Sequence, residues 1–257
     1  MSVRDNIAHV VLNRPDKLNA LDPAMMEALV QTGTELRDRK DVAVVVVSGA
    51  GRAFCSGLDL SQFDQMRERR AADVVVLGDR LGAARALGQK AVHVWSLISV
   101  PVVAAVHGVA IGGGLQLALG ADIRIATPDS QWSVMEIRWG IIPDMTGTQL
   151  LPEIVGRDRA KELTFTGRRI DGSTAAEIGM VTTLADDPLS AAFGLAEEIA
   201  THPRNALCEA KRLLDLSGRV PLTDGFDAEQ DAIAALMGSE EQVAAVNGRL
   251  GPTAKLR

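Results

Sequence analysis

Apolar positions follow the periods of strands and helices in turn up to about residue 185, and the period of helices after it. Alternating or continuous apolar runs predict strands at 7–12, 42–47, 100–106, 122–126 and 130–135. Spacings of three and four residues predict helices at 23–39, over most of 61–98, at 115–119 and from 149 onward. A strand-like interruption near 180–184 precedes three predicted helices at 188–201, 203–217 and 223–237. The alternation predicts an α/β fold followed by helices.

Local signals mark where some elements begin and end. Asp22 is a favourable N-cap and Pro23 suits the first helical position, so a helix is predicted to begin there. We divide the chain into a core that holds the functional site, 1–187, and a helical C-terminal region, 188–257, suited to oligomerisation. The end of that region, 247–257, contains Gly and Pro and is expected to be loosely held.

Composition and charge narrow the class of protein. The 257 residues are 47% hydrophobic and 23% charged, as in ordinary globular chains, and the net charge is −6. This acidic balance argues against a nucleic-acid partner, and the basic cluster at 67–70 is interpreted as a solvated helix face. No apolar run has the length of a membrane span. The cysteines and scattered histidines predict neither a disulfide framework nor a metal site, and no apolar leader precedes the first strand, so we expect a cytoplasmic protein.

Two glycine-rich turns follow buried strands, at 49–60 and at 112–114. A strand that ends in glycines and leads into a helix presents free backbone N–H groups, which favour negative charge. Leu117 stands where a dinucleotide fingerprint needs its third glycine, and 167–173 lacks the lysine of a P-loop. The glycines can also serve helix–strand packing alone. If the two turns converge on one oxygen atom, their amides form an oxyanion hole.

Five stretches, in this order along the chain, resemble the crotonase superfamily of enoyl-CoA hydratases and isomerases. They are LNRPDKLNALD (12–22), GAGRAFCSGLDL (49–60), PVVAAVHGVAIGGGLQLALGADIRIA (101–126), GIIPDMTGTQLLPEIVG (140–156) and ELTFTGRRIDGSTAAEIGMV (162–181). The resemblance implies a spiral of repeated ββα units with C-terminal helices that assemble a homotrimer or a hexamer made of two trimers. It implies an acyl-CoA substrate, with coenzyme A entering as part of that substrate and no metal or redox cofactor.

The resemblance also implies site residues. It assigns the two oxyanion-hole amides to Leu58 and Gly113, and it places the adenine and ribose of coenzyme A near 17–20 and 54–56. Trp132 and Trp139 flank Glu136 and are expected to line or support the acyl pocket, where apolar walls would raise the pKa of that glutamate. The residues implied in substrate binding are Lys17, Asn19, Ala20, Phe54, Ser56, Gly57, Asp59, Trp132 and Trp139.

The candidate acids and bases distinguish the activities within that superfamily. Its hydratases use two glutamates; Glu136 matches one of them, and Gln116 stands in place of the other. A glutamine can hold water or substrate by hydrogen bonds, but it cannot accept a proton. A double-bond shift needs only one carboxylate, so double-bond isomerisation is favoured over hydration. Asp144 lies eight residues after Glu136, where the family's dienoyl-CoA isomerases carry an aspartate, and is a candidate second acid or base.

Several alternatives stay open. Glu136 can be a structural acid paired with Arg138 or Arg124, and Asp144 can be the N-cap of a helix that begins near Thr146. The chain can be a true hydratase in which Glu136 and Asp144 share the work. It can also be an acyl-CoA-binding protein with little turnover, which the missing carboxylate at position 116 favours.

Overall fold

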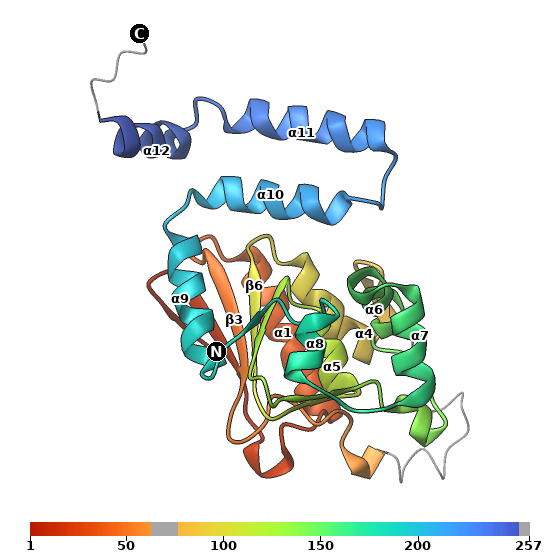
Figure 1. Cartoon of the computed structure of the whole chain (residues 1–257). Helices are drawn as coiled ribbons and strands as arrows, with labels where there is room; N and C mark the ends of the chain where they lie inside the picture. The colour runs from red at the N-terminus through yellow and green to blue at the C-terminus, as the bar shows by residue number, and fades with distance from the viewer. Residues whose placement is uncertain (63–76, 252–257) are drawn as a thin grey trace.

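A six-stranded sheet forms the first layer of the molecule. In the computed structural model, which describes residues 1–62 and 77–251, its strand order is β1-β2-β3-β6-β8-β11, and β2, β3, β6, β8 and β11 run parallel (Figure 1). β1 pairs antiparallel with β2 at one edge. The bounds are β1 Ser2–Arg4, β2 Ile7–Leu12, β3 Val44–Gly49, β6 Val102–Val106, β8 Ile123–Ala126 and β11 Thr183–Leu184.

Both faces of this sheet are covered, which explains the continuous apolar runs of its central strands. Val44, Val46 and Val103 pack in a cluster with Ala192 and Ala196 of the helix α9 (Pro188–Ala200). Alternate side chains of the same strands, such as those of Val45 and Val47, belong to the larger core cluster on the opposite face. The period of two along each strand separates the two cores.

A second, smaller sheet lies beyond the first and has the order β10-β9-β7. Its strands are β7 Val109–Ile111, β9 Gln131–Ser133 and β10 Ile170–Asp171. β7 directly follows β6 and β9 directly follows β8, so each turn of the chain supplies one strand to each layer. Parallel bridges between Cys55 and Ala110 and between Leu21 and Leu58 extend the second layer. The predicted α/β fold with repeated ββα units is confirmed.

Helices close the turns of this spiral. α1 (Pro23–Asp38) begins as predicted, because the Asp22 carboxylate accepts a hydrogen bond from Met25 N at 2.8 Å. α5 (Gly113–Leu119) follows β7, and the other elements of this part are η1 Pro15–Lys17, α4 Leu87–His93, η2 Val94–Leu97, η3 Glu136–Trp139, α6 Gly147–Val155, α7 Arg157–Thr166 and α8 Gly172–Glu177.

The predicted helix over most of 61–98 is wrong between 77 and 86. A hairpin occupies that stretch, formed by β4 (Leu77–Leu81) and β5 (Ala84–Ala86). Gly82 has φ +56° at its turn, and the next amide, Ala83 N, donates to Nε2 of His93. Tertiary contact and one left-handed glycine therefore override the helical composition of the segment. Residues 63–76, with the basic cluster at 67–70, lie outside the described part.

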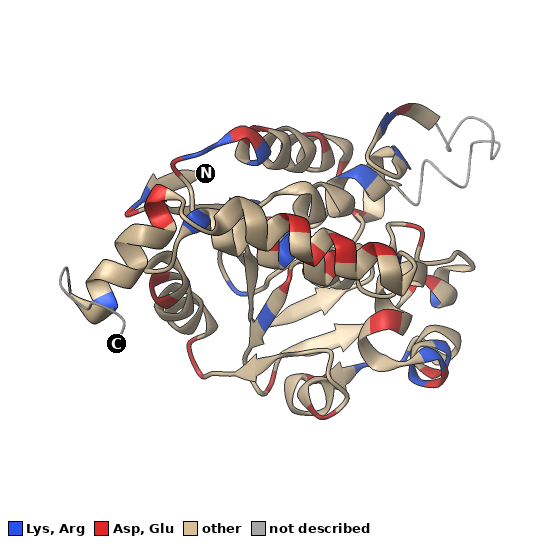
Figure 2. Ribbon diagram, turned by 90° about the horizontal axis from the view of Figure 1, so that it is seen from above, with Lys and Arg blue, Asp and Glu red and all other residues tan. Residues whose placement is uncertain are grey.

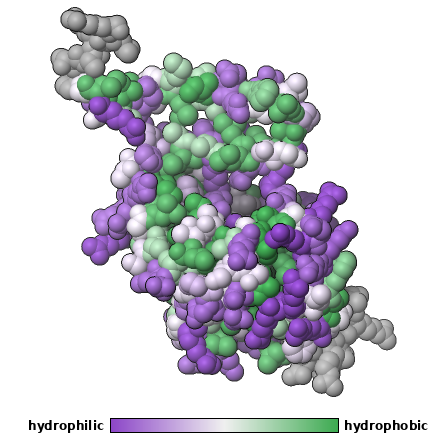
Figure 3. Space-filling model, in the orientation of Figure 1, coloured by the Kyte–Doolittle hydropathy of each residue, from purple (hydrophilic) through white to green (hydrophobic). Residues whose placement is uncertain are grey.

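The C-terminal helices after α9 form an arm that extends away from the sheet (Figure 1). It consists of α10 (Arg204–Leu216), α11 (Leu222–Leu236) and α12 (Glu240–Leu250). Of the segment 247–257 that was expected to be loosely held, 247–250 belong to α12, and 252–257 lie outside the described part. Figure 3 shows apolar side chains among charged ones on the arm. Acidic residues lie along α11 itself (Figure 2). Within 1–62 and 77–251, no helix has the length and apolar character needed to cross a bilayer.

Candidate active site

The two glycine-rich turns lie against each other, as the sequence led us to expect. A Cβ added at Gly57 would lie 2.6 Å from the carbonyl oxygen of Ile111 and 3.5 Å from Gly113 N. A Cβ added at Gly114 would lie 2.2 Å from the carbonyl oxygen of Cys55. Side chains at either position would push the turns apart. The packing role that the sequence left open is therefore real, and it brings the backbone amides of both turns together.

Gly112 serves a second purpose at the beginning of α5. Its backbone has φ +55° and ψ −122°, a combination that favours glycine. A Cβ added there would lie 3.3 Å from Oε1 of Glu136. Glycine at this position therefore lets the chain turn into α5 while the Glu136 carboxyl lies directly against the backbone.

The amides of Leu58 and Gly113 are both free to donate. Leu21 forms a parallel bridge beside the first turn: Leu21 N donates to the carbonyl of Gly57 at 2.7 Å, and Asp59 N donates to the carbonyl of Leu21 at 2.9 Å. The bridge uses the groups on either side of Leu58 N and leaves that amide out. Gly113 N is the first amide of α5. Neither amide donates to an acceptor within the described residues.

The side chain of Gln116 makes three hydrogen bonds within the site. Its side chain is buried, and its Nε2 donates to Oε1 of Glu136 at 2.6 Å. Its Oε1 accepts from Met145 N at 2.9 Å and from Gly147 N at 2.8 Å. Backbone N–H groups can only donate, so they fix which end of the amide is the oxygen. Gln116 therefore holds Glu136 on one side and the beginning of α6 on the other.

Glu136 is a buried carboxyl with one unused oxygen. Its exposed fraction is 7%, and its Oε2 has no hydrogen-bond partner among the described residues. Burial raises the pKa of Glu136, and the nearby charge of Asp144 raises it further. Arg124 instead donates to the carbonyls of Met180 and Ala121, and no ion pair joins Glu136 to Arg124 or Arg138 in the described part. The interpretation of Glu136 as a paired structural acid is wrong.

Asp144 lies in the loop before α6. The N-cap of α6 is Thr146, and no side chain of that residue or of Asp144 accepts from the first amides of the helix; Gln116 does so instead. The interpretation of Asp144 as a helix cap is therefore wrong. Asp144 is an exposed residue, yet the surrounding protein removes enough water from its carboxyl to raise its pKa. Two carboxyl groups with raised pKa values thus lie near each other.

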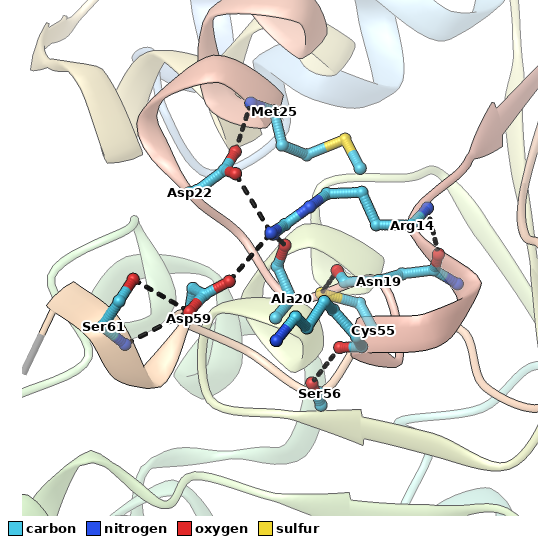
Figure 4. Close-up of polar contacts among 10 residues, drawn as sticks. Arg14, Asn19, Ala20, Asp22, Met25, Cys55, Ser56, Asp59 and Ser61 are labelled. Carbon is cyan, nitrogen blue, oxygen red and sulfur yellow. Dashed lines mark hydrogen bonds and ion pairs between the residues drawn. The ribbon is translucent and has the colours of Figure 1, made fainter.

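The two segments implied in coenzyme A binding, 17–20 and 54–56, lie side by side (Figure 4). Ser56 N donates to the carbonyl of Leu18 at 3.0 Å, and Sγ of Cys55 donates to the carbonyl of Asn19 at 3.1 Å. Lys17 and Ser56 keep some exposure there, whereas the side chains of Asn19 and Phe54 are fully buried. Because both residues are buried whole, neither Asn19 nor Phe54 presents a surface to a ligand.

Other predicted site residues differ in what they can contact. Trp132 is fully buried, and its Nε1 donates to Oγ of Ser130, so its side chain can support a pocket but presents no surface to a ligand. Trp139 is 51% exposed. Burial raises the pKa of Cys55 to about 12, which keeps its thiol neutral and makes it a packing residue. In residues 1–62 and 77–251 no cluster of His, Cys, Asp or Glu could hold a metal ion.

Arg14 is a site residue that the sequence reasoning missed. Its guanidinium donates to the carbonyl of Ala20 and to Oδ2 of Asp59, and it forms an ion pair with Asp22 (Figure 4). A single arginine among the polar residues of 12–22 gives no sequence signal for this contact, because Asp59 lies in a different turn.

Comparisons with known proteins show which family this chain is similar to. A family model described as enoyl-CoA hydratase/isomerase matches residues 2–248. YngF of Bacillus subtilis (strain 168), provisionally named an enoyl-CoA hydratase/isomerase, is 35% identical over 231 residues, which cover 89% of this chain and 85% of that protein. The peroxisomal Delta(3,5)-Delta(2,4)-dienoyl-CoA isomerase of Arabidopsis thaliana is 31% identical over 254 residues, covering 95% and 90%. A crystal structure from Mycobacterium abscessus, provisionally an enoyl-CoA hydratase/isomerase, is similar with a TM-score of 0.88 and 32% identity, covering 97% and 95%.

Proposed function

Because the chain belongs to the enoyl-CoA hydratase/isomerase family, we propose that it moves a carbon–carbon double bond of an unsaturated acyl-CoA thioester by proton transfer, in preference to adding water. The observation that carries this proposal is the contact between Gln116 and Glu136. An amide donor occupies the place opposite the buried carboxyl, with its oxygen already engaged by two backbone amides. Gln116 therefore has no lone pair left with which to activate a water molecule.

Glu136 is the proposed acid and base. Its Oε1 accepts the hydrogen bond from Gln116, so Oε2 is the oxygen available to remove the proton on the carbon next to the thioester. A raised pKa suits a group that must first accept a proton and then return it further along the acyl chain. The N–H groups of Leu58 and Gly113 would stabilise the enolate oxygen that forms between these two steps.

Asp144 is the proposed second acid and base. In a 3,5-dienoyl thioester the proton leaves C2, and a 2,4-dienoyl product forms when a proton is added at C6. Two carboxyls near each other can divide this work between the two ends of the trienolate that forms in between. The relative from Arabidopsis that is named for this reaction supports a dienoyl substrate here.

Two other functions remain as competitors. In a hydratase, Asp144 would have to activate water in the place of the missing glutamate, with Glu136 as the acid. In an acyl-CoA-binding protein, the buried carboxyl would have no use in turnover. The unpartnered Oε2 of Glu136, held in place by Gln116, favours a reacting group over a passive one.

The substrate would supply coenzyme A, and we propose no further cofactor and no metal, because enolate chemistry at a thioester needs neither. The adjacent segments 17–20 and 54–56 are the proposed coenzyme A site, with Gly57 and Asp59 at its inner end. We propose a cytoplasmic location. A homotrimer, alone or as half of a hexamer, is the proposed assembly, because the arm exposes Leu222, Phe226 and Ile233 on α11 and Met237 at its C-cap.

A panel assay tests the proposal. Thioesters of 2-enoyl, 3-enoyl and 3,5-dienoyl acids of several lengths are supplied, and the products are identified by mass and ultraviolet absorbance. We expect double-bond shifts in the 3-enoyl or 3,5-dienoyl substrates and slow hydration of 2-enoyl-CoA. The matched variants are Glu136→Gln, which should be inactive in every reaction, and Glu177→Gln on the exposed end of α8, which should be fully active.

Each competitor has its own outcome in the same assay. Efficient hydration without any double-bond shift would support the hydratase. Tight binding of the thioesters without turnover would support the binding protein. Full turnover by Glu136→Gln would contradict the role assigned to that residue in both the isomerase and the hydratase.

A further inference from the structure

The turn that carries Leu58 is held from behind by another segment of the chain. The backbone of Leu21 accepts from Asp59 N and donates to the carbonyl of Gly57, so both neighbours of Leu58 are fixed. The direction of Leu58 N–H therefore depends on where the segment around Leu21 lies relative to this turn. A group that links these two segments therefore also fixes the direction in which Leu58 N–H points.

Arg14 is such a group. Its Nη1 donates to the carbonyl of Ala20 at 2.5 Å, immediately before Leu21. Its Nη2 donates to Oδ2 of Asp59 at 2.9 Å, immediately after Leu58, and lies 3.2 Å from Oδ2 of Asp22. Figure 4 shows the guanidinium between these oxygens. One side chain thus contacts both segments on either side of their bridge.

The contacts of Arg14 with Ala20, Asp22 and Asp59 are better shielded from water than an ordinary surface ion pair. The side chain of Asp59 is only 14% exposed and that of Arg14 is 26% exposed, so water screens the contact less than at a free surface. Hydrogen bonds from Ser61 N and from Arg14 lower the pKa of Asp59 and keep it ionised. A planar guanidinium can serve several oxygens at fixed angles, whereas the ammonium group of lysine is a single point of charge.

The charge of Arg14 has a second effect. Asp22 and Asp59 place two negative charges close to the turn that would hold a developing oxyanion. The guanidinium offsets one of them. Without Arg14, the turn would lose its alignment and would also lie beside two uncompensated carboxylates, and both changes disfavour negative charge on the substrate oxygen.

We propose that Arg14 is a positioning residue that aims Leu58 N–H at the thioester oxygen by tying Asp59 to the backbone of 20–22. The inference rests on the proposed function, since it assumes that this amide stabilises an enolate. In this role Arg14 acts through Asp59 and the backbone of 20–22, which it contacts, and not through the substrate. Its removal should lower kcat and leave KM nearly unchanged, because the alignment matters most when charge develops on the oxygen.

The test uses Arg14→Gln, Arg14→Lys and Asp59→Asn in the full-length chain, with Arg39→Gln as the matched control. Arg39 forms a similar arginine–aspartate pair with Asp41, on the surface at the end of α1. Turnover is measured on the best thioester of the panel. Infrared difference spectra are recorded with a saturated acyl-CoA that is isotope-labelled at the thioester carbonyl. Polarisation by the two amides lowers the frequency of that carbonyl on binding.

We expect Arg14→Gln to lower kcat by about 10- to 100-fold, which is less than the loss of a whole oxyanion donor. The carbonyl shift should shrink in the same variant, Arg14→Lys should be intermediate, and Arg39→Gln should match the wild type. Wild-type kcat and carbonyl shift in folded Arg14→Gln overturn the inference, as does a loss confined to thermal stability or to KM. If Arg14→Gln does not fold, Asp59→Asn decides: an unchanged carbonyl shift there overturns the inference. A wild type without turnover and without any carbonyl shift contradicts the proposed function itself.

Discussion

The side-chain amide of Gln116 donates a hydrogen bond of 2.6 Å to Oε1 of Glu136. This contact fixes one oxygen of the glutamate as an acceptor and leaves the other oxygen as the one that can carry a proton. The orientation cannot reverse, because two backbone amides hold the oxygen of Gln116 at its other end. The proton chemistry of the site is therefore limited to what one carboxyl, with Asp144 nearby, can perform.

Replacing Gln116 by Glu should add hydration to the activities of the protein. Two carboxyl oxygens 2.6 Å apart would share one proton, so the pKa of the pair would split and one value would rise. Water would regain a base as well as an acid. Because such assistance is worth about 10²–10⁴, we expect hydration of 2-enoyl-CoA to rise at least about tenfold. The pH profile should move at the same time.

The matched control for this change is Gln149→Glu, an exposed glutamine in α6. Its hydration rate and pH profile should equal those of the wild type. If Gln116→Glu also leaves both quantities unchanged, the glutamine does not decide between the two reactions.

Replacing Glu136 by Gln should change how stability depends on pH. The folded-state pKa of Glu136 is raised by burial, so folding favours the protonated form. The stabilising contribution of that form is fully present below the ordinary value of 4.5 and is lost as the pH rises through the folded-state pKa. The melting temperature of Glu136→Gln relative to wild type should therefore increase with pH across this window. Parallel melting curves for the two proteins from acid to neutral pH would show that Glu136 is not perturbed.

Replacing Asp144 by Asn should lower the pKa of Glu136, because the carboxylate that raises it is gone. In the proposed reaction Glu136 acts first as a base, so it must be ionised when the substrate binds. The acid limb of the pH profile of kcat/KM on a 3-enoyl-CoA should therefore move to lower pH. Turnover of a 3,5-dienoyl-CoA should fall more than that of the 3-enoyl substrate. Asp158→Asn, at an exposed position in α7, serves as the control and should leave the acid limb in place.

Replacing Gly113 by Pro should remove one oxyanion donor. Position 113 is the first residue of α5, where proline is well tolerated, and the loss of one donor typically costs about 10²–10³ in rate. Gly113→Ala adds the same Cβ and keeps the N–H. That Cβ would meet the ends of the Met145 and Leu21 side chains, which can move aside, so we expect Ala to retain most of the activity. Equal activity of the Pro and Ala variants, with circular dichroism confirming the fold, would remove Gly113 from the oxyanion hole.

Light scattering at micromolar concentration should show an assembly larger than a monomer of 27.2 kDa. On α11, Leu222 is 72% exposed and Phe226 55%, and the C-cap residue Met237 is 69% exposed. Phe226→Glu should dissociate the assembly, whereas Gln230→Glu, at another exposed position of α11, should not. A monomeric wild type would contradict the proposed homotrimer or hexamer.

Much of the fold could be predicted because its signals are local. The strand at Ile7–Leu12 and the helix that begins at Pro23 each carry their own apolar period, and Asp22 marks the boundary. The hairpin at 77–86 could not be predicted in this way, because His93 and Gly82 stabilise it from outside the apolar pattern. The spacing of apolar residues along the chain carries no information about contacts between separate elements.

In the candidate site, too, the residue types could be interpreted from the sequence, but their contacts could not. The identity of position 116 could be interpreted from the sequence, since a glutamine differs chemically from a glutamate wherever it lies. Its bonds to the beginning of α6 could not, because Met145 and Gly147 come close to it only in the folded chain. The same holds for Arg14, whose partner Asp59 belongs to another turn of the spiral.

The three consecutive glycines at 112–114 bear on how freely this chain can vary. A methyl group at Gly112 would reach the Glu136 carboxyl, one at Gly113 would reach Met145 and Leu21, and one at Gly114 would reach the backbone of Cys55. Glu136 and Met145 lie between β9 and α6, whereas Leu21 and Cys55 lie in earlier parts of the chain. The side-chain ends beside Gly113 can move aside, whereas the backbone of Cys55 beside Gly114 cannot, so the constraint is strictest at Gly114. Substitutions in those distant segments are therefore limited by how closely they pack against the backbone of 112–114.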